Sequence, residues 1–156
     1  MASTLVPFEK FGAAGLFFLG FFWNILIWTA PVWLRLLPES GIQLVNLLLN
    51  PVCHRTPELS WWWNGAPILV CIRCSAIYLA FSLGNLTGFL NLKIQPTFRW
   101  VWVSFGLLLL DFVLNLTGLK PLSEPLRALT GGLFGFITGW WLLINVLNSD
   151  RTKNVQ

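Results

Sequence analysis

Three long stretches without a formally charged side chain dominate this sequence and constrain its fold more than any other feature. Residues 11–33, 74–92 and 128–149 contain no Asp, Glu, Lys or Arg. Each stretch reaches the roughly 20 residues that an α-helix needs to cross the hydrocarbon core of a bilayer. A fourth stretch, residues 100–117, is interrupted only by Asp111. The pattern therefore predicts an all-α, polytopic helical bundle that crosses a membrane four times.

The composition favours the same surroundings. Only 10% of the residues are charged and 56% are hydrophobic, whereas a soluble domain carries about 25% charged residues. Because so few charges cannot coat a globule in water, the lipid bilayer of a plasma membrane or an internal membrane is the expected partner. The net charge of +4 comes without a clustered basic face, so nucleic-acid binding is not expected.

The chain is expected to form one membrane domain over residues 1–156, a length that suits a single domain. The spans are predicted at about 11–34, 74–92, 99–118 and 126–147, with a frayed polar tail at 148–156. A helix at about 41–52 is too short to cross. Its polar residues Gln43, Asn46 and Asn50 share one face, so it is expected in the interface or as a re-entrant segment. Prolines predict an irregular loop after it.

Glycines recur at intervals of four residues in two of the predicted spans. Gly131, Gly135 and Gly139 lie in the last span, and Gly84 and Gly88 lie in the second. In lipid, small residues at this spacing let helix backbones approach closely. Packing between helices of one chain is the main interpretation. A homo-oligomer or contact with other membrane subunits is the secondary one.

Four crossings would bring the polar residues to one side of the membrane. The loop 35–73 and the turn 120–125 would share that side, and Asp111 would lie roughly 10 Å from it at 1.5 Å per residue. An ionised carboxylate inside a span costs several kcal/mol unless it is paired. Arg127 starts the next helix on the same side and is the expected partner. A proton-relay or metal-ligand role for Asp111 is the alternative.

The cysteines form the main chemical motif. Cys71 and Cys74 are a Cys-x-x-Cys pair, and Cys53 and His54 precede them across a loop. Two residues between thiolates let both reach one tetrahedral ion. We therefore expect a metal site from these four residues, holding zinc or another thiophilic metal such as copper(I) or iron. Cysteines that are simply buried, without a ligand, are the plain alternative.

Charged residues flank the thiols. Arg55, Glu58 and Arg73 are expected to balance the charge of a thiolate-rich site or to bind an anionic headgroup. A second hypothesis uses the same cysteines in a membrane thiol–disulfide oxidoreductase linked to a quinone, because Arg73 and a helix amino terminus would lower a cysteine pKa. Such enzymes normally use a second cysteine pair, and this chain has three cysteines. A structural or assembly subunit of a membrane complex is the third hypothesis.

These motifs also resemble those of a known family. The chain reads Cys-His-Arg-Thr-Pro-Glu-Leu-Ser from Cys53, Cys-Ile-Arg-Cys-Ser-Ala-Ile-Tyr from Cys71 and Leu-Arg-Ala-Leu-Thr-Gly from Leu126. Together with Asp111, these segments are similar to the signature of the membrane proteins grouped as domain of unknown function 2085 (DUF2085). The resemblance covers about residues 52–135. It implies a multi-pass membrane protein with a Cys-His…Cys-x-Arg-Cys site and no particular activity.

Overall fold

The computed structural model describes residues 7–51, 53, 57–89, 96–117 and 123–153. Within them the chain is almost entirely helical, as predicted. The long helices are α1 (Pro7–Trp33), α3 (Ile72–Phe89), α4 (Phe98–Leu116) and α5 (Glu124–Lys153). Shorter pieces join α1 to α3. They are the 3₁₀ turns η1 (Leu34–Leu36) and η2 (Pro57–Leu59), the helix α2 (Glu39–Leu49), and the strands β1 (Trp62–Trp63) and β2 (Ala66–Pro67).

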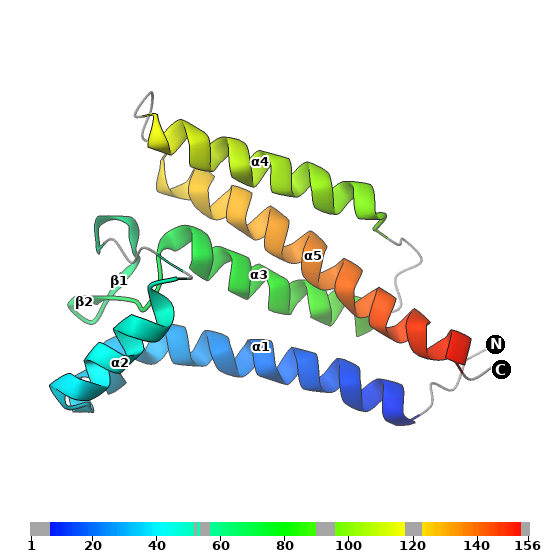
Figure 1. Ribbon diagram of the computed structural model, residues 1–156, viewed down its shortest axis with the longest axis horizontal. Helices are drawn as coiled ribbons and strands as arrows, with labels where there is room; N and C mark the ends of the chain where they lie inside the picture. Colours follow the sequence, from blue (N-terminus) through cyan, green and yellow to red (C-terminus); the bar gives the residue numbers. More distant parts are fainter. Residues whose placement is uncertain (1–6, 52, 54–56, 90–95, 118–122, 154–156) are drawn as a thin grey trace.

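The four long helices lie side by side in the order α4, α5, α3, α1 (Figure 1). The short elements all gather at the end where α1 stops and α3 begins. The centre of the molecule is therefore the α3–α5 pair, with α1 on one flank and α4 on the other. α4 packs mainly on α5 and leaves most of its large apolar side chains exposed, as expected for a helix whose other surroundings are lipid.

Helices α3 and α5 run parallel with their backbones in direct contact. A Cβ added to Gly135 would collide with the carbonyl oxygen of Ile77, and one on Gly139 would collide with that of Phe81. On α3, a Cβ on Gly84 would meet the backbone of Phe136 in return. Small residues at intervals of four permit this approach in lipid. The glycine pattern thus serves packing within the chain, which confirms the main interpretation of the sequence.

Helices α1 and α3 run antiparallel and are joined by a polar contact. The buried Asn24 amide donates to the carbonyl oxygens of Gly20, at 2.8 Å, and Tyr78, at 3.1 Å. It also donates to Ser82 Oγ at 3.0 Å. Because lipid offers no hydrogen-bond partners, a buried amide of this kind favours one alignment of the two helices.

Three of the described helices are long and apolar enough to cross a membrane. These spans cover Ala14–Leu36, Phe98–Leu116 and Glu124–Val146. α3 forms where the second of four spans was expected but is not among them, and it carries Arg73 and buried polar residues such as Ser75 and Asn85. A helix packed between protein neighbours can hold polar side chains that a lipid-facing helix cannot.

Other boundaries also differ from those expected. The predicted short helix is present as α2, which buries Leu49 and exposes Leu44, Leu47 and Leu48. Helix α5 continues to Lys153, so most of the tail predicted to fray from residue 148 is helical. No glycine or proline interrupts residues 140–153, and polar residues alone do not end a helix. The last residues, 154–156, lie outside the described part.

The loop predicted to be irregular contains a small hairpin. Trp62 pairs with Pro67, and Trp63 pairs with Ala66. Asn64 and Gly65 form its turn with positive φ angles of 51° and 74°. An Asn-Gly pair favours a two-residue hairpin turn of this type, and Asn64-Gly65 is such a pair between the two strands.

We expect Gly135→Ala to destabilise the protein, because the new methyl group would overlap the α3 backbone. Overpacking of this kind costs about 1–3 kcal/mol. Gly106 has nothing within 4 Å of an added Cβ, so Gly106→Ala should be neutral or stabilising by up to about 1 kcal/mol from helix propensity. Unfolding of both variants in detergent measures the difference. Equal stabilities would contradict the close approach of α3 and α5.

Candidate metal centre

The three cysteines come from two separate segments that meet at the end of the bundle. Cys53 follows α2, and its backbone N–H donates to the carbonyl oxygen of Leu49 at 2.9 Å. Cys71 directly precedes α3, and Cys74 lies in the first turn of that helix. A spacing of three residues in a helical turn places Cys71 and Cys74 on one face. The chain thus returns from Cys53 to the Cys-x-x-Cys pair through η2 and the hairpin.

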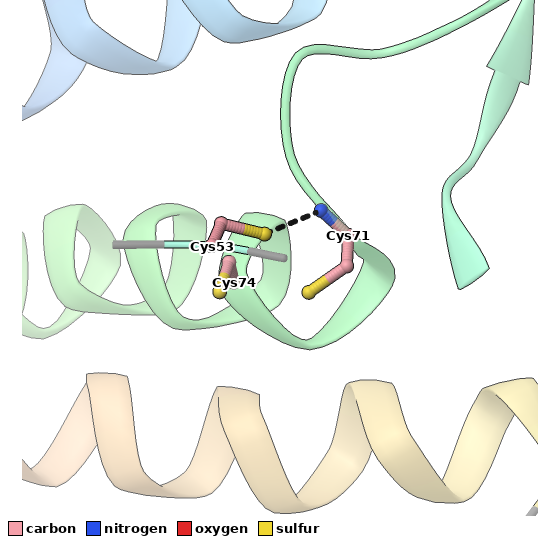
Figure 2. Close-up of side chains that lie close together, drawn as sticks. All are labelled: Cys53, Cys71 and Cys74. Atoms are coloured by element: carbon pink, nitrogen blue, oxygen red, sulfur yellow. Dashed lines mark hydrogen bonds between the residues drawn. The ribbon is translucent and has the colours of Figure 1, made fainter. Parts of the chain in front are cut away.

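The sulfur atoms form a compact cluster. All three lie within 4.8 Å of one another, and Figure 2 shows Cys53, Cys71 and Cys74 drawn together at the start of α3. All three are thiols rather than disulfides. Zinc–sulfur bonds of about 2.3 Å in a tetrahedral site separate the sulfurs by roughly 3.8 Å. Small side-chain adjustments would therefore convert this cluster into three ligands of one metal ion.

The cluster lies in an apolar environment. Cys53 is 5% exposed and belongs to a hydrophobic cluster with Ile27, Leu49 and Val70, while Cys71 and Cys74 are half-buried. The backbone N–H of Cys71 donates to Cys53 Sγ at 3.3 Å (Figure 2). Such a bond also suits a metal-bound thiolate, whose excess charge is stabilised by neighbouring donors.

The electrostatics favour protonated thiols when no metal is bound. The pKa of the Cys71 thiol is raised above its ordinary value of 9.0, first by its hydrogen bond with Cys53 and then by burial. The hydrogen bond with Cys74 acts in the opposite direction. The expectation of a lowered cysteine pKa is therefore wrong for Cys71, because the hydrogen bond with Cys53 and burial raise it. A neutral thiol is a poor nucleophile, since reactivity follows the thiolate.

The buried acid Asp111 pairs with Arg73, and its expected pairing with Arg127 is wrong. Arg127 instead donates to Asn115 Oδ1 on the same face of α4. The reason is the antiparallel packing of α4 and α5. Arg127 lies in the first turn of α5 and meets the end of α4, while Asp111 lies one turn deeper. A Cβ added to Gly131 would lie 2.6 Å from the carbonyl oxygen of Arg73. The glycine therefore lets α3 and α5 approach closely at this point, and Arg73 reaches Asp111 on α4.

The other predicted site residues, His54, Arg55 and Glu58, are not part of the thiol cluster as described. His54 and Arg55 lie outside the described residues. Glu58 is in η2 and exposed to solvent. The described part therefore brings together three of the four expected ligands, and it pairs Arg73 with Asp111. Asn115 was not expected to take part, and no spacing rule in the sequence singles it out from other polar residues of the spans.

Comparison with known proteins agrees with this arrangement. A family model described as "Predicted membrane protein (DUF2085)" matches residues 53–141, which includes the three cysteines, Arg73, Asp111 and Arg127. The uncharacterized protein MJ1492 of Methanocaldococcus jannaschii is 26% identical over 96 residues, which is 59% of this chain and 62% of that protein. The chain thus spans about three fifths of that relative's length. No solved structure matches.

The matched region begins at the first cysteine and ends within α5, so it contains the three cysteines together with α3, α4 and the first part of α5. It covers more than half of the chain. The three apolar helices long enough to span a bilayer agree with the description of the family. This protein is a membrane protein of the DUF2085 family.

Proposed function

We propose that this protein is a membrane-embedded metal-binding protein in which Cys53, Cys71 and Cys74 hold one thiophilic ion, with zinc as the first candidate. The observation that carries the proposal is the convergence of three sulfur atoms from two segments to within 4.8 Å. Three soft thiolates suit zinc and also admit copper(I) or iron. The apolar surroundings of Cys53 would exclude water from most of the ion's coordination shell.

The role of the ion depends on its fourth ligand. His54 is the natural candidate because it adjoins Cys53 in the sequence, and four protein ligands would make a closed, structural site. The ion would then fasten the segment after α2 to the first turn of α3. With water as the fourth ligand, the site would be open to Lewis-acid chemistry.

We further propose that α3 is the fourth crossing helix. Its 18 residues correspond to about 27 Å at 1.5 Å per residue, close to the hydrocarbon thickness of about 30 Å. Three of its uncharged polar side chains, Ser75, Ser82 and Asn85, are each at most 6% exposed, so neighbouring helices rather than lipid surround them. The metal centre would then lie at one membrane face.

Metal content tests the proposal directly. Protein purified in detergent should carry close to one zinc per chain, measured by elemental analysis, and Cys71→Ser with Cys74→Ser should lose it. Ala76→Ser, which adds a hydroxyl in the same turn of α3 without removing a ligand, is the matched control and should keep the metal. His54→Ala separates a closed site from an open one, because loss of affinity assigns His54 as a ligand.

A different result would favour the oxidoreductase. Metal-free protein in which a Cys71–Cys74 disulfide forms with a membrane quinone and is reduced again by thiols would overturn the metal proposal. Metal-free protein with thiols inert to both would leave an assembly role as the remaining hypothesis.

Thiol reactivity should depend on pH in a specific direction. Because hydrogen bonding with Cys53 and burial raise the pKa of Cys71 above 9.0, its alkylation in metal-free protein should reach half its maximal rate above pH 9.0. Cys53→Ala removes the largest cause and should move this midpoint down. Alkylation rates measured by mass spectrometry across pH test both expectations. A wild-type midpoint below pH 9.0 would contradict the protonated cluster.

Labelling from each side of a vesicle tests the crossing of α3. In a background with the three native cysteines changed to alanine, single cysteines replace Glu58, Thr97 and Ser123, which are exposed. If α3 and α4 both cross, an impermeant thiol reagent should reach positions 58 and 123 from one side and position 97 from the other. Positions 58 and 97 on the same side would show that α3 does not cross.

A further inference from the structure

Two buried or half-buried arginines and one buried carboxylate meet on one face of α4, and one of the arginines, Arg73, lies between Cys71 and Cys74 in the sequence. Asp111 is 3% exposed and Arg127 8% exposed, and the side chain of Arg73 is 19% exposed. Arg73 pairs with Asp111, and Arg127 pairs with Asn115 one turn away. The amide of Asn115 also donates to the backbone carbonyl of Asp111 at 2.8 Å. These four side chains form a single polar cluster.

The charges of this polar cluster do not balance. Among the described side chains of this cluster, two guanidinium groups and one carboxylate leave one excess positive charge, because Asn115 is neutral. Glu124, in the first turn of α5, is exposed, and solvent screens it. An uncompensated charge in a low-dielectric environment is costly. Three thiolates around a divalent ion carry a net charge of −1. This charge would balance the excess positive charge of the polar cluster.

Arg73 connects the thiol cluster with the polar cluster on α4 along the chain. Its backbone lies between Cys71 and Cys74 in the sequence, and its guanidinium reaches across to Asp111. The guanidinium carbon also lies 6.0 Å from the centre of the Phe112 ring, within range of a cation–π contact. A Cβ added to Gly131 of α5 would lie 3.2 Å from Arg73 Cγ, so α5 passes close to the aliphatic part of this side chain. The positive charge of Arg73 therefore lies at Asp111 on α4, while its backbone lies within the Cys71–Cys74 turn.

We propose that Arg73 is the counter-charge of the metal centre, and that Arg73 and Asp111 set the centre's affinity for a divalent ion in opposite directions. The proposal rests on the metal-binding function above. Formation of the centre replaces three neutral thiols and a free divalent ion by a unit with charge −1 and three released protons. A nearby positive charge favours that change, and a nearby negative charge opposes it.

The coupling is reciprocal. If Arg73 stabilises the metal-bound centre, metal binding draws on the same guanidinium that holds Asp111. Metal occupancy is thereby linked to the contact between α3 and α4. Apart from this contact, the two helices are joined mainly by α5, which packs against both. Arg73 acts as a positioning and charge-balancing residue and not as a ligand.

The sign of the effect on zinc affinity tests the proposal. Asp111→Asn removes the opposing charge and should lower the zinc dissociation constant by about tenfold, the effect of a unit charge at a separation of several ångströms. Arg73→Gln combined with Asp111→Asn should return the affinity to the wild-type value or below it. Arg127→Gln removes an equal charge outside the Cys71–Cys74 loop and should change the affinity less. Competition with a chromophoric chelator measures all four proteins.

A purely structural ion pair gives a different pattern. Asp111→Asn would then weaken zinc binding or leave it unchanged, and either result overturns the charge proposal. Asn115→Asp gives an independent check in case Asp111→Asn does not fold. It adds a carboxylate that pairs with Arg127, and it should weaken zinc binding several-fold; tighter or unchanged binding contradicts the proposal. Wild-type protein that binds no zinc would overturn the metal site itself, which distinguishes the two failures.

Discussion

The backbone contact between α3 and α5 is the interaction on which the rest of the molecule depends. Glycines on both helices let them run parallel at a distance where any side chain would collide with a carbonyl group. Because the helices are parallel, their first turns lie at the same end of the bundle. Cys74 and Arg73 on one helix, and Arg127 on the other, are thereby delivered to one place. α4 then has to return antiparallel, which carries Asp111 and Asn115 to the same end.

Lipid as a solvent explains why the polar residues are arranged in pairs and clusters. A carboxylate, a guanidinium or an amide inside a bilayer finds no water, so each must find a partner in the protein. Asn24 uses the backbone of α3, Asp111 uses Arg73, and Arg127 uses Asn115. Each of these contacts joins two helices. The same groups that would be costly alone therefore specify which helices are neighbours and in which register.

Much of this could be predicted from the sequence because the responsible signals are local and periodic. Charge-free stretches predicted the long helices, and glycines at intervals of four predicted the close packing. The choice between Arg73 and Arg127 as partner of Asp111 could not be made in this way. It depends on the positions of both α3 and α5 relative to α4, and these follow from packing between helices, such as the close approach of Gly131 to the backbone of Arg73 on α3. The length of α5 differs from the prediction for another reason, because polar residues such as those after residue 148 do not by themselves end a helix.

The hairpin after η2 has a consequence for the behaviour of the thiols. Arg35 donates to the carbonyl oxygen of Asn64 at 2.7 Å, which ties the turn to the end of α1, and the Trp61 carbonyl accepts from Ile68 N–H at 2.8 Å. Much of the connection leading to Cys71 is thus already ordered by hydrogen bonds within the protein. Closing a loop between ligands is entropically unfavourable when the chain is flexible. Here much of that ordering accompanies folding, so the folded chain itself brings the three sulfur atoms to within 4.8 Å of one another.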